Sequence, residues 1–105
     1  MNKIKIIALG GKITLDDISQ LDQTVKTSTI IGDLKEDLFQ ASFPAEQILD
    51  IGWYPEFCES GQFRISLILN QNWEKPHYTE NAKNWAELET ALERTLKKIK
   101  FPQCY

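Results

Sequence analysis

Two stretches of alternating side chains, joined by a short loop, constrain this fold more than any other feature. The stretches cover residues 47–55 and 62–70, and a period of two is typical of a strand with one buried face. The link between them, residues 56–61, ends in Gly61, which is free to take a positive φ. The pattern therefore predicts a β-hairpin. Its alternating apolar positions are Leu49, Ile51, Trp53, Phe63, Ile65, Leu67 and Leu69.

A second periodicity, of three and four residues, runs through the last quarter of the chain. Asn84 is a good N-cap and Glu87 fits as its capping-box partner, so we expect a helix to begin here and Pro102 to stop it. A helix with one apolar stripe needs a sheet face to cover it. The stripe consists of Trp85, Leu88, Leu92, Leu96 and Ile99.

The first half of the chain is expected to supply a strand at residues 3–9 and then a short helix. Thr14 would cap that helix, with Asp17 as its capping-box partner. Its core-facing side chains would be Ile18, Leu21 and Val25.

Three further segments complete the expected sheet region. The β-branched residues 27–31 favour extended chain. Residues 33–40 fit a helical turn, but alternation over 38–43 favours a strand, and a short strand is expected around 76–80. The predicted fold is therefore α+β: an antiparallel sheet of four or five strands packed against a C-terminal amphipathic helix and a shorter N-terminal helix, as one domain over residues 1–105.

Size and composition indicate an ordinary globular protein. The chain has 105 residues, of which 42% are hydrophobic and 26% charged. The apolar run Ile6–Leu9 is too short for a signal peptide, and no stretch approaches the roughly 20 apolar residues of a membrane span. Cys58 and Cys104 are best explained as free thiols in a reducing cytosol, although one disulfide is geometrically possible. We expect a cytoplasmic protein with no membrane partner.

The sequence contains no motif of catalysis or of cofactor binding. It has neither a phosphate-binding glycine loop nor a nucleophile elbow, and its three Cys and His residues are too few for a structural zinc site. A nucleophilic pair of Cys58 and His77 is the one enzymatic alternative, and a surface position for His77 is favoured over it. We therefore expect a protein that is not an enzyme and holds no metal or cofactor.

The charge is distributed unevenly along the chain. The net charge of −3 is the sum of +3 over residues 1–12, −8 over 13–60 and +2 over 61–105. An acidic balance argues against a generic nucleic-acid binder. The acidic middle fits either a solvated face that keeps the protein soluble or a surface that attracts a basic partner such as a nuclease.

The best candidates for a partner-binding site are the acids and aromatic side chains near the predicted turns. Loops commonly present binding groups, and aromatic residues commonly anchor protein interfaces. The candidates are Asp33, Glu36, Asp37, Tyr54, Glu56, Phe57 and Glu59.

The order of motifs in the second half resembles that of a known protein class. A Gly-Trp-Tyr-Pro signature lies within residues 48–56; it is followed by Gly61-Gln-Phe63, by residues 64–68, by 72–76 and by the capped helix. This pattern, covering about residues 46–100, resembles small immunity proteins of bacterial polymorphic-toxin and contact-dependent growth inhibition systems.

The resemblance implies a cytoplasmic, non-enzymatic inhibitor. Such a protein would bind the C-terminal toxin domain of a cognate effector and occlude its active site or an exosite. No binding residue is carried over by position, because each immunity protein has its own interface. The alternative is a small nucleic-acid or ribosome-associated accessory protein that uses the aromatic side chains of its strands.

Overall fold

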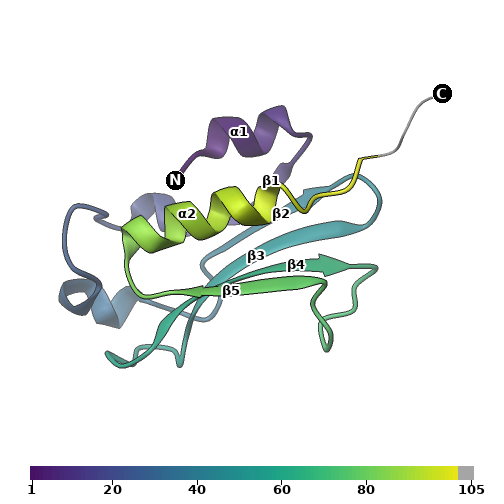
Figure 1. Cartoon of the computed structure of the whole chain (residues 1–105). Helices are drawn as coiled ribbons and strands as arrows, with labels where there is room; N and C mark the ends of the chain where they lie inside the picture. The colour runs from purple at the N-terminus through teal and green to yellow at the C-terminus, as the bar shows by residue number, and fades with distance from the viewer. Residues whose placement is uncertain (102–105) are drawn as a thin grey trace.

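The computed structural model describes residues 1–101 and has five antiparallel strands with two α-helices on one face of the sheet (Figure 1). The strands follow one another in the sheet in chain order, β1-β2-β3-β4-β5. This arrangement confirms the predicted α+β fold. The strands are β1 (Lys12–Asp16), β2 (Phe39–Phe43), β3 (Gln47–Tyr54), β4 (Gln62–Leu69) and β5 (Tyr78–Ala82). The helices are α1 (Lys3–Ala8) and α2 (Trp85–Leu96), with short 3-10 segments η1 (Ile18–Gln20) and η2 (Thr27–Asp33).

The predicted hairpin is the centre of the sheet. β3 and β4 pair in register from Gln47 opposite Leu69 to Tyr54 opposite Gln62. Gly61 does not take the positive φ that is open to a glycine. In this loop the residue with a positive φ is Phe57, with φ 58°. Gly61 is instead required by close packing. A Cβ there would lie 2.6 Å from the indole nitrogen of Trp53.

The C-terminal helix begins as the sequence predicts. The Asn84 side chain accepts a hydrogen bond of 2.8 Å from the Glu87 amide, and the Glu87 carboxylate accepts one of 3.2 Å from the Lys83 amide. Leu88, Leu92 and Leu96 are buried against the sheet. The helix ends at Leu96, so Ile99 is buried just beyond it. Pro102 lies outside the described residues.

The prediction of a strand at residues 3–9 is wrong, because these residues form α1. The Asn2 side chain caps the helix by accepting a hydrogen bond of 3.0 Å from the Lys5 amide. Lys3 pairs with Asp16 at 3.1 Å, and only Ile6 is buried. The alternation of lysine and isoleucine does not mark one buried face, because in α1 Ile6 is buried whereas Ile4 is exposed.

The predicted helix capped by Thr14 is also wrong. Residues 12–16 form β1, and the Thr14 hydroxyl donates a hydrogen bond of 3.3 Å to the Gln40 carbonyl on β2. Ile18 is buried as expected, but it begins the 3-10 turn η1.

The remaining expectations differ in detail. Residues 27–31 belong to the 3-10 segment η2 rather than to an extended stretch. The strand expected at 38–43 is confirmed as β2, and the strand expected at 76–80 forms two residues later as β5.

The register gives the sheet two distinct ends. At one end lie the β2–β3 turn, the β4–β5 loop and the residues after α2, because Gln47 at the start of β3 binds Lys100. At the other end lie the β3–β4 loop and the chain segment that precedes β2. The eight residues of β3 separate these ends by about 23 Å. Figure 1 shows both ends, with the N-terminal 3-10 segments at the second one.

Gln47 fixes the chain after α2 to the sheet. Its buried amide donates hydrogen bonds to the carbonyls of Lys100 (2.6 Å) and Pro44 (2.7 Å) and accepts one from the Lys100 amide (2.7 Å). We expect Gln47→Ala to lower the free energy of unfolding by about 1–3 kcal/mol, because it removes the partners of these backbone groups. Urea denaturation would measure the loss. Gln20→Ala on the exposed end of η1 is the control, and equal midpoints for the two variants would contradict this role.

Candidate functional site

A segment before β2 packs against the end of β3 and brings two groups of predicted site residues together. The Trp53 amide donates to the Lys35 carbonyl at 2.7 Å, and the Phe57 amide donates to the Leu34 carbonyl at 2.9 Å. The Glu36 amide also donates, at 3.5 Å, to the Glu56 carboxylate. Residues 33–37 and the β3–β4 loop therefore form one surface.

Gly52 makes this packing possible. The Glu36 backbone lies directly over Gly52, on the sheet face opposite the helices, and a Cβ at residue 52 would lie 1.7 Å from the Glu36 carbonyl oxygen. Any other residue would have to displace the segment that carries Glu36 and Asp37. The glycine is thus required by a close approach of two backbones.

Around Gly52, side chains from four segments form what we call the acidic surface. It comprises Glu36, Asp37, Asp50, Tyr54 and Glu56, together with Arg64 of β4. Burial raises the pKa of Tyr54, and the nearby charges of Asp50, Glu36 and Asp37 raise it further. The Arg64 guanidinium opposes this shift and stacks 4.4 Å from the centre of the Tyr54 ring.

Asp50 is the most buried carboxylate of the acidic surface. Burial raises its pKa, the hydrogen bond of 2.9 Å from the Gln40 amide opposes the shift, and the charge of Asp37 adds to it. Asp50 therefore contributes negative potential from a buried position on the strand, whereas the carboxylates of Glu36, Asp37 and Glu56 are exposed to solvent.

The carboxylates of the acidic surface are not neutralised by ion pairs. In residues 1–101, the five ion pairs within 4.0 Å involve other acids: Glu89, Asp16, Glu93, Asp17 and Glu80. Even the neighbouring Lys35 pairs with Asp17, at 3.8 Å. The negative charges of this surface thus remain available to a partner.

Most of the predicted site residues belong to this surface or border it. Asp33 ends η2 beside the segment, and Phe57 is 51% exposed next to it. Glu59 lies elsewhere, in a hollow that Thr27 and Lys83 also line. The structure therefore does not bring Glu59 together with the other candidates.

Sequence reasoning missed two members of the site. Asp50 and Arg64 lie on the same sheet face as Tyr54, Asp50 through alternation along β3 and Arg64 opposite Gly52 on β4. The alternation had already indicated that Asp50 and Tyr54 share a face. Nothing in the sequence indicated that residues 36 and 37 would lie over that face.

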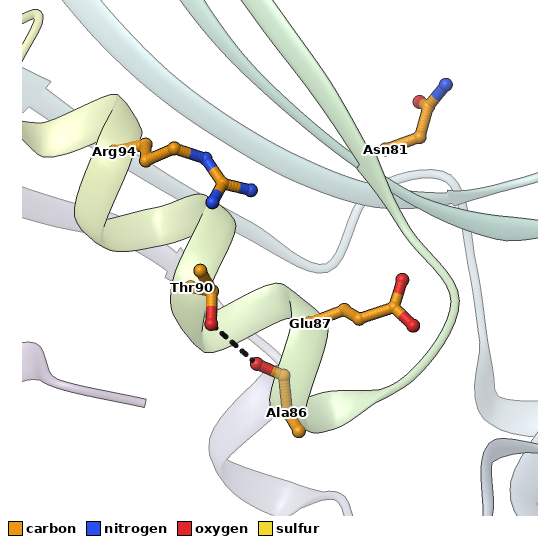
Figure 2. A pocket seen from close by; sticks show the side chains of 5 residues that line it. All are labelled: Asn81, Ala86, Glu87, Thr90 and Arg94. Atoms are coloured by element: carbon orange, nitrogen blue, oxygen red, sulfur yellow. Dashed lines mark hydrogen bonds between the residues drawn. The ribbon is translucent and has the colours of Figure 1, made fainter.

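A shallow hollow between α2 and β5 offers no free reactive group (Figure 2). Its Glu87 carboxylate caps the helix, its Thr90 hydroxyl donates to the Ala86 carbonyl at 3.3 Å, and its Arg94 binds Glu80. Three of its polar side chains are thus engaged within the fold.

The structure separates the residues of the enzymatic alternative. Cys58 lies in the β3–β4 loop, whereas the His77 amide binds the Leu67 carbonyl near the opposite end of the sheet. A hydrogen bond with the Ser60 hydroxyl lowers the pKa of the Cys58 thiol, but His77 is too distant to act as its base. Over the described chain, no three His, Cys, Asp or Glu side chains gather as metal ligands.

Two aromatic side chains of the central strands are not available for base stacking. Trp53 and Phe63 are 1% and 0% exposed and contact each other edge to face in the core, with ring centres 4.9 Å apart. Of the aromatic side chains on these two strands, Tyr54 is the one that remains partly exposed.

Comparisons with protein-family models, with curated proteins and with solved structures found no match to this chain. Among residues 1–101, none of the helices has the length and apolar character needed to cross a bilayer.

We expect Gly52→Ala to displace residues 35–37 and so lower the pKa of Tyr54, because Glu36 and Asp37 would move away from its ring. Ultraviolet titration of the phenol, with Tyr54→Phe identifying its signal, would measure the change. Gly32→Ala is the matched control, since a Cβ at Gly32 meets nothing within 4 Å. An unchanged Tyr54 titration in Gly52→Ala would show that Gly52 does not position the segment.

A second prediction concerns the pH dependence of stability. Because the pKa of Asp50 is raised in the folded state, the folded protein binds this proton more tightly than the unfolded chain does. The contribution of Asp50 to the free energy of unfolding therefore falls as pH rises through the raised pKa. We expect Asp50→Asn, which still accepts the Gln40 hydrogen bond, to be more stable than the wild type at neutral pH.

This advantage should vanish below pH 3.8, the ordinary pKa of the group, where Asp50 is protonated in both states. Chemical denaturation across a pH series would test it. Asp22→Asn should act in the opposite direction, because hydrogen bonds from Thr24 lower the pKa of Asp22. Loss of stability in Asp50→Asn at neutral pH would contradict the prediction.

Proposed function

We propose that this chain is an immunity protein that binds a basic toxin domain through the acidic surface. The observation that carries the proposal is that Glu36, Asp37 and Glu56 are held together by backbone packing, without ion pairs. The motif order of residues 46–100 adds the resemblance to immunity proteins of bacterial toxin systems. Neither argument requires a reaction at the site.

A nuclease-type toxin is the partner that this chemistry fits best. An enzyme that cleaves a nucleic acid must attract phosphates, so its active site is surrounded by positive potential. A concentrated negative surface complements that potential, speeds the encounter and competes with the phosphate backbone. The inhibitor then acts by occluding the active site or an adjacent exosite.

Two aromatic side chains supply apolar contact within and beside the negative field. Tyr54 is partly buried beneath Arg64, and Phe57 projects from the β3–β4 loop with half of its surface exposed. Interfaces commonly combine a central aromatic anchor with a polar rim. We infer that Phe57 is the anchor and that Asp33, Glu36, Asp37 and Glu56 form the rim.

The test is the double variant Glu36→Gln, Glu56→Gln, measured against the toxin domain that the proposal predicts to be encoded beside this gene. At low salt we expect the association rate to fall roughly tenfold, with a flatter salt dependence, because electrostatic steering is lost. The matched control is Glu46→Gln, Glu74→Gln, which changes the net charge equally at the other end of the sheet. Stopped-flow kinetics over a salt series would separate the two.

Equal association rates for the two double variants would exclude the acidic surface as the docking site. Failure of the wild-type chain to co-purify with the neighbouring toxin domain, or to protect cells that express it, would exclude the proposed function itself.

A further inference from the structure

Five lysines gather at the end of the molecule opposite the acidic surface, which we call the basic end. Lys12 begins β1 at this end, opposite Ser42, and Lys100 binds Gln47 at the start of β3. The five are Lys12, Lys75, Lys97, Lys98 and Lys100, and all are exposed. The ion pairs within residues 1–101 include none of them, and Lys98 Nζ lies 5.3 Å from the centre of the Tyr78 ring. These lysines outnumber the acids Glu46 and Glu74 of the same end.

Exposed large apolar side chains lie at the same end and on helix α1. Phe101 follows Lys100 and is 49% exposed, and Trp73 in the β4–β5 loop is 47% exposed. Ile4 and Ile7 project from α1 with 83% and 60% of their surfaces exposed. Across residues 1–101 the remaining exposed large apolar side chain is Phe57, in the β3–β4 loop beside the acidic surface.

Helix α1 runs beside α2 toward the basic end. The amino group of Met1 pairs with Glu89 at 2.9 Å, Lys5 pairs with Glu93 at 4.0 Å, and Gly10 comes next to Pro44 of the β2–β3 turn. Figure 1 shows the two helices side by side, with the chain after α2 leaving near the end of α1. Ile7 therefore lies toward the lysines rather than toward the acidic surface.

We propose that the basic end is a docking surface for an anionic lipid bilayer. Lysines attract anionic headgroups, while isoleucine, tryptophan and phenylalanine enter the boundary between headgroups and acyl chains. A phosphate backbone would engage the lysines but would leave the apolar side chains in water. The combination of both kinds of side chain thus favours a lipid surface over a nucleic acid.

This attachment needs no membrane-spanning segment, which was the basis for expecting no membrane partner. With the basic end on lipid, the acidic surface lies farther from the bilayer, because Gly52 at its centre is about 17 Å from Gln47 along β3. The inference does not depend on the proposed function, because the acidic surface takes no part in lipid contact.

The experiment is co-sedimentation of the full chain with vesicles of phosphatidylcholine alone or of equal parts phosphatidylcholine and phosphatidylglycerol. We expect binding to the anionic vesicles only, weakened by salt. Lys97→Gln, Lys98→Gln, Lys100→Gln should lower the partition coefficient roughly a hundredfold, because each lysine near such a surface contributes about fivefold. The matched control removes Lys26, Lys35 and Lys83, which are equally exposed, and should bind nearly as the wild type does.

A second pair of variants tests the apolar contact. The double variant Ile4→Gln, Ile7→Gln should weaken binding to the anionic vesicles, and glutamine is a good helix former, so α1 should be retained. The control variant Phe57→Gln, beside the acidic surface, should bind the vesicles as the wild type does. Trp73 emission should shift to shorter wavelength on the vesicles, and Trp73→Phe should abolish that shift. Circular dichroism of each variant checks that the fold is retained.

Three outcomes would overturn the proposal. They are the absence of binding to anionic vesicles, an equal loss in the two triple-lysine variants, and binding that is insensitive to Ile4 and Ile7. Fluorescence polarisation with a labelled oligonucleotide completes the test. Tight oligonucleotide binding that needs the same three lysines, without vesicle binding, would assign the basic end to nucleic acid instead.

Discussion

The eight-residue pairing of β3 with β4 is the interaction on which the rest of this structure depends. In this register Trp53 lies opposite Phe63 and Ile51 opposite Ile65, so both strands turn their large apolar side chains toward the helices. The same register places Gly52 opposite Arg64 and Asp50 opposite Ser66 on the other face. A shift by one residue would exchange the two faces. The core and the acidic surface are therefore two consequences of a single register.

The acidic surface is stable because backbone groups, rather than opposite charges, hold its carboxylates near one another. Close carboxylates repel, and an ion pair within the protein would relieve the repulsion but would also cancel the field that a partner could feel. Here the Lys35 carbonyl binds the Trp53 amide and the Glu36 backbone rests on Gly52. Burial is the main cause of the raised pKa values of Asp50 and Tyr54, and the repulsion between the negative charges adds to it.

The sequence was informative wherever one periodicity extended over eight or more residues. The pairing of β3 with β4 and the capped helix α2 could be predicted because their patterns were long and their end signals agreed. The segments before β2 were misassigned because each is short and fits two patterns. Four residues of alternating lysine and isoleucine fit both a strand and one helical turn, and long-range contacts such as Lys3 with Asp16 decided between them.

The candidate site shows the same division between local and long-range information. Acids near turns could be found from sequence, and alternation along β3 related Tyr54 to Asp50. The contact between Glu36 and Gly52 joins residues sixteen positions apart without regular strand pairing, so no local sequence pattern predicts it. Glu59, only three residues beyond Glu56, lines a separate hollow, because the direction of a loop side chain depends on the conformation of the loop, in which Phe57 takes the left-handed region.

The two ends of the sheet give the molecule a polarity that its net charge of −3 conceals. Strands in an antiparallel meander return to the same two ends, so loops far apart in sequence accumulate at each end. Acids from residues 33–37 and the β3–β4 loop meet at one end, and at the other end lysines from β1, the β4–β5 loop and the chain after α2 outnumber Glu46 and Glu74. Charged side chains that lie between the ends are paired with opposite charges, as Lys5 is with Glu93. The topology thus separates charges of opposite sign by more than the screening length of about 8 Å at physiological salt, so each end presents its own sign of potential to an approaching surface.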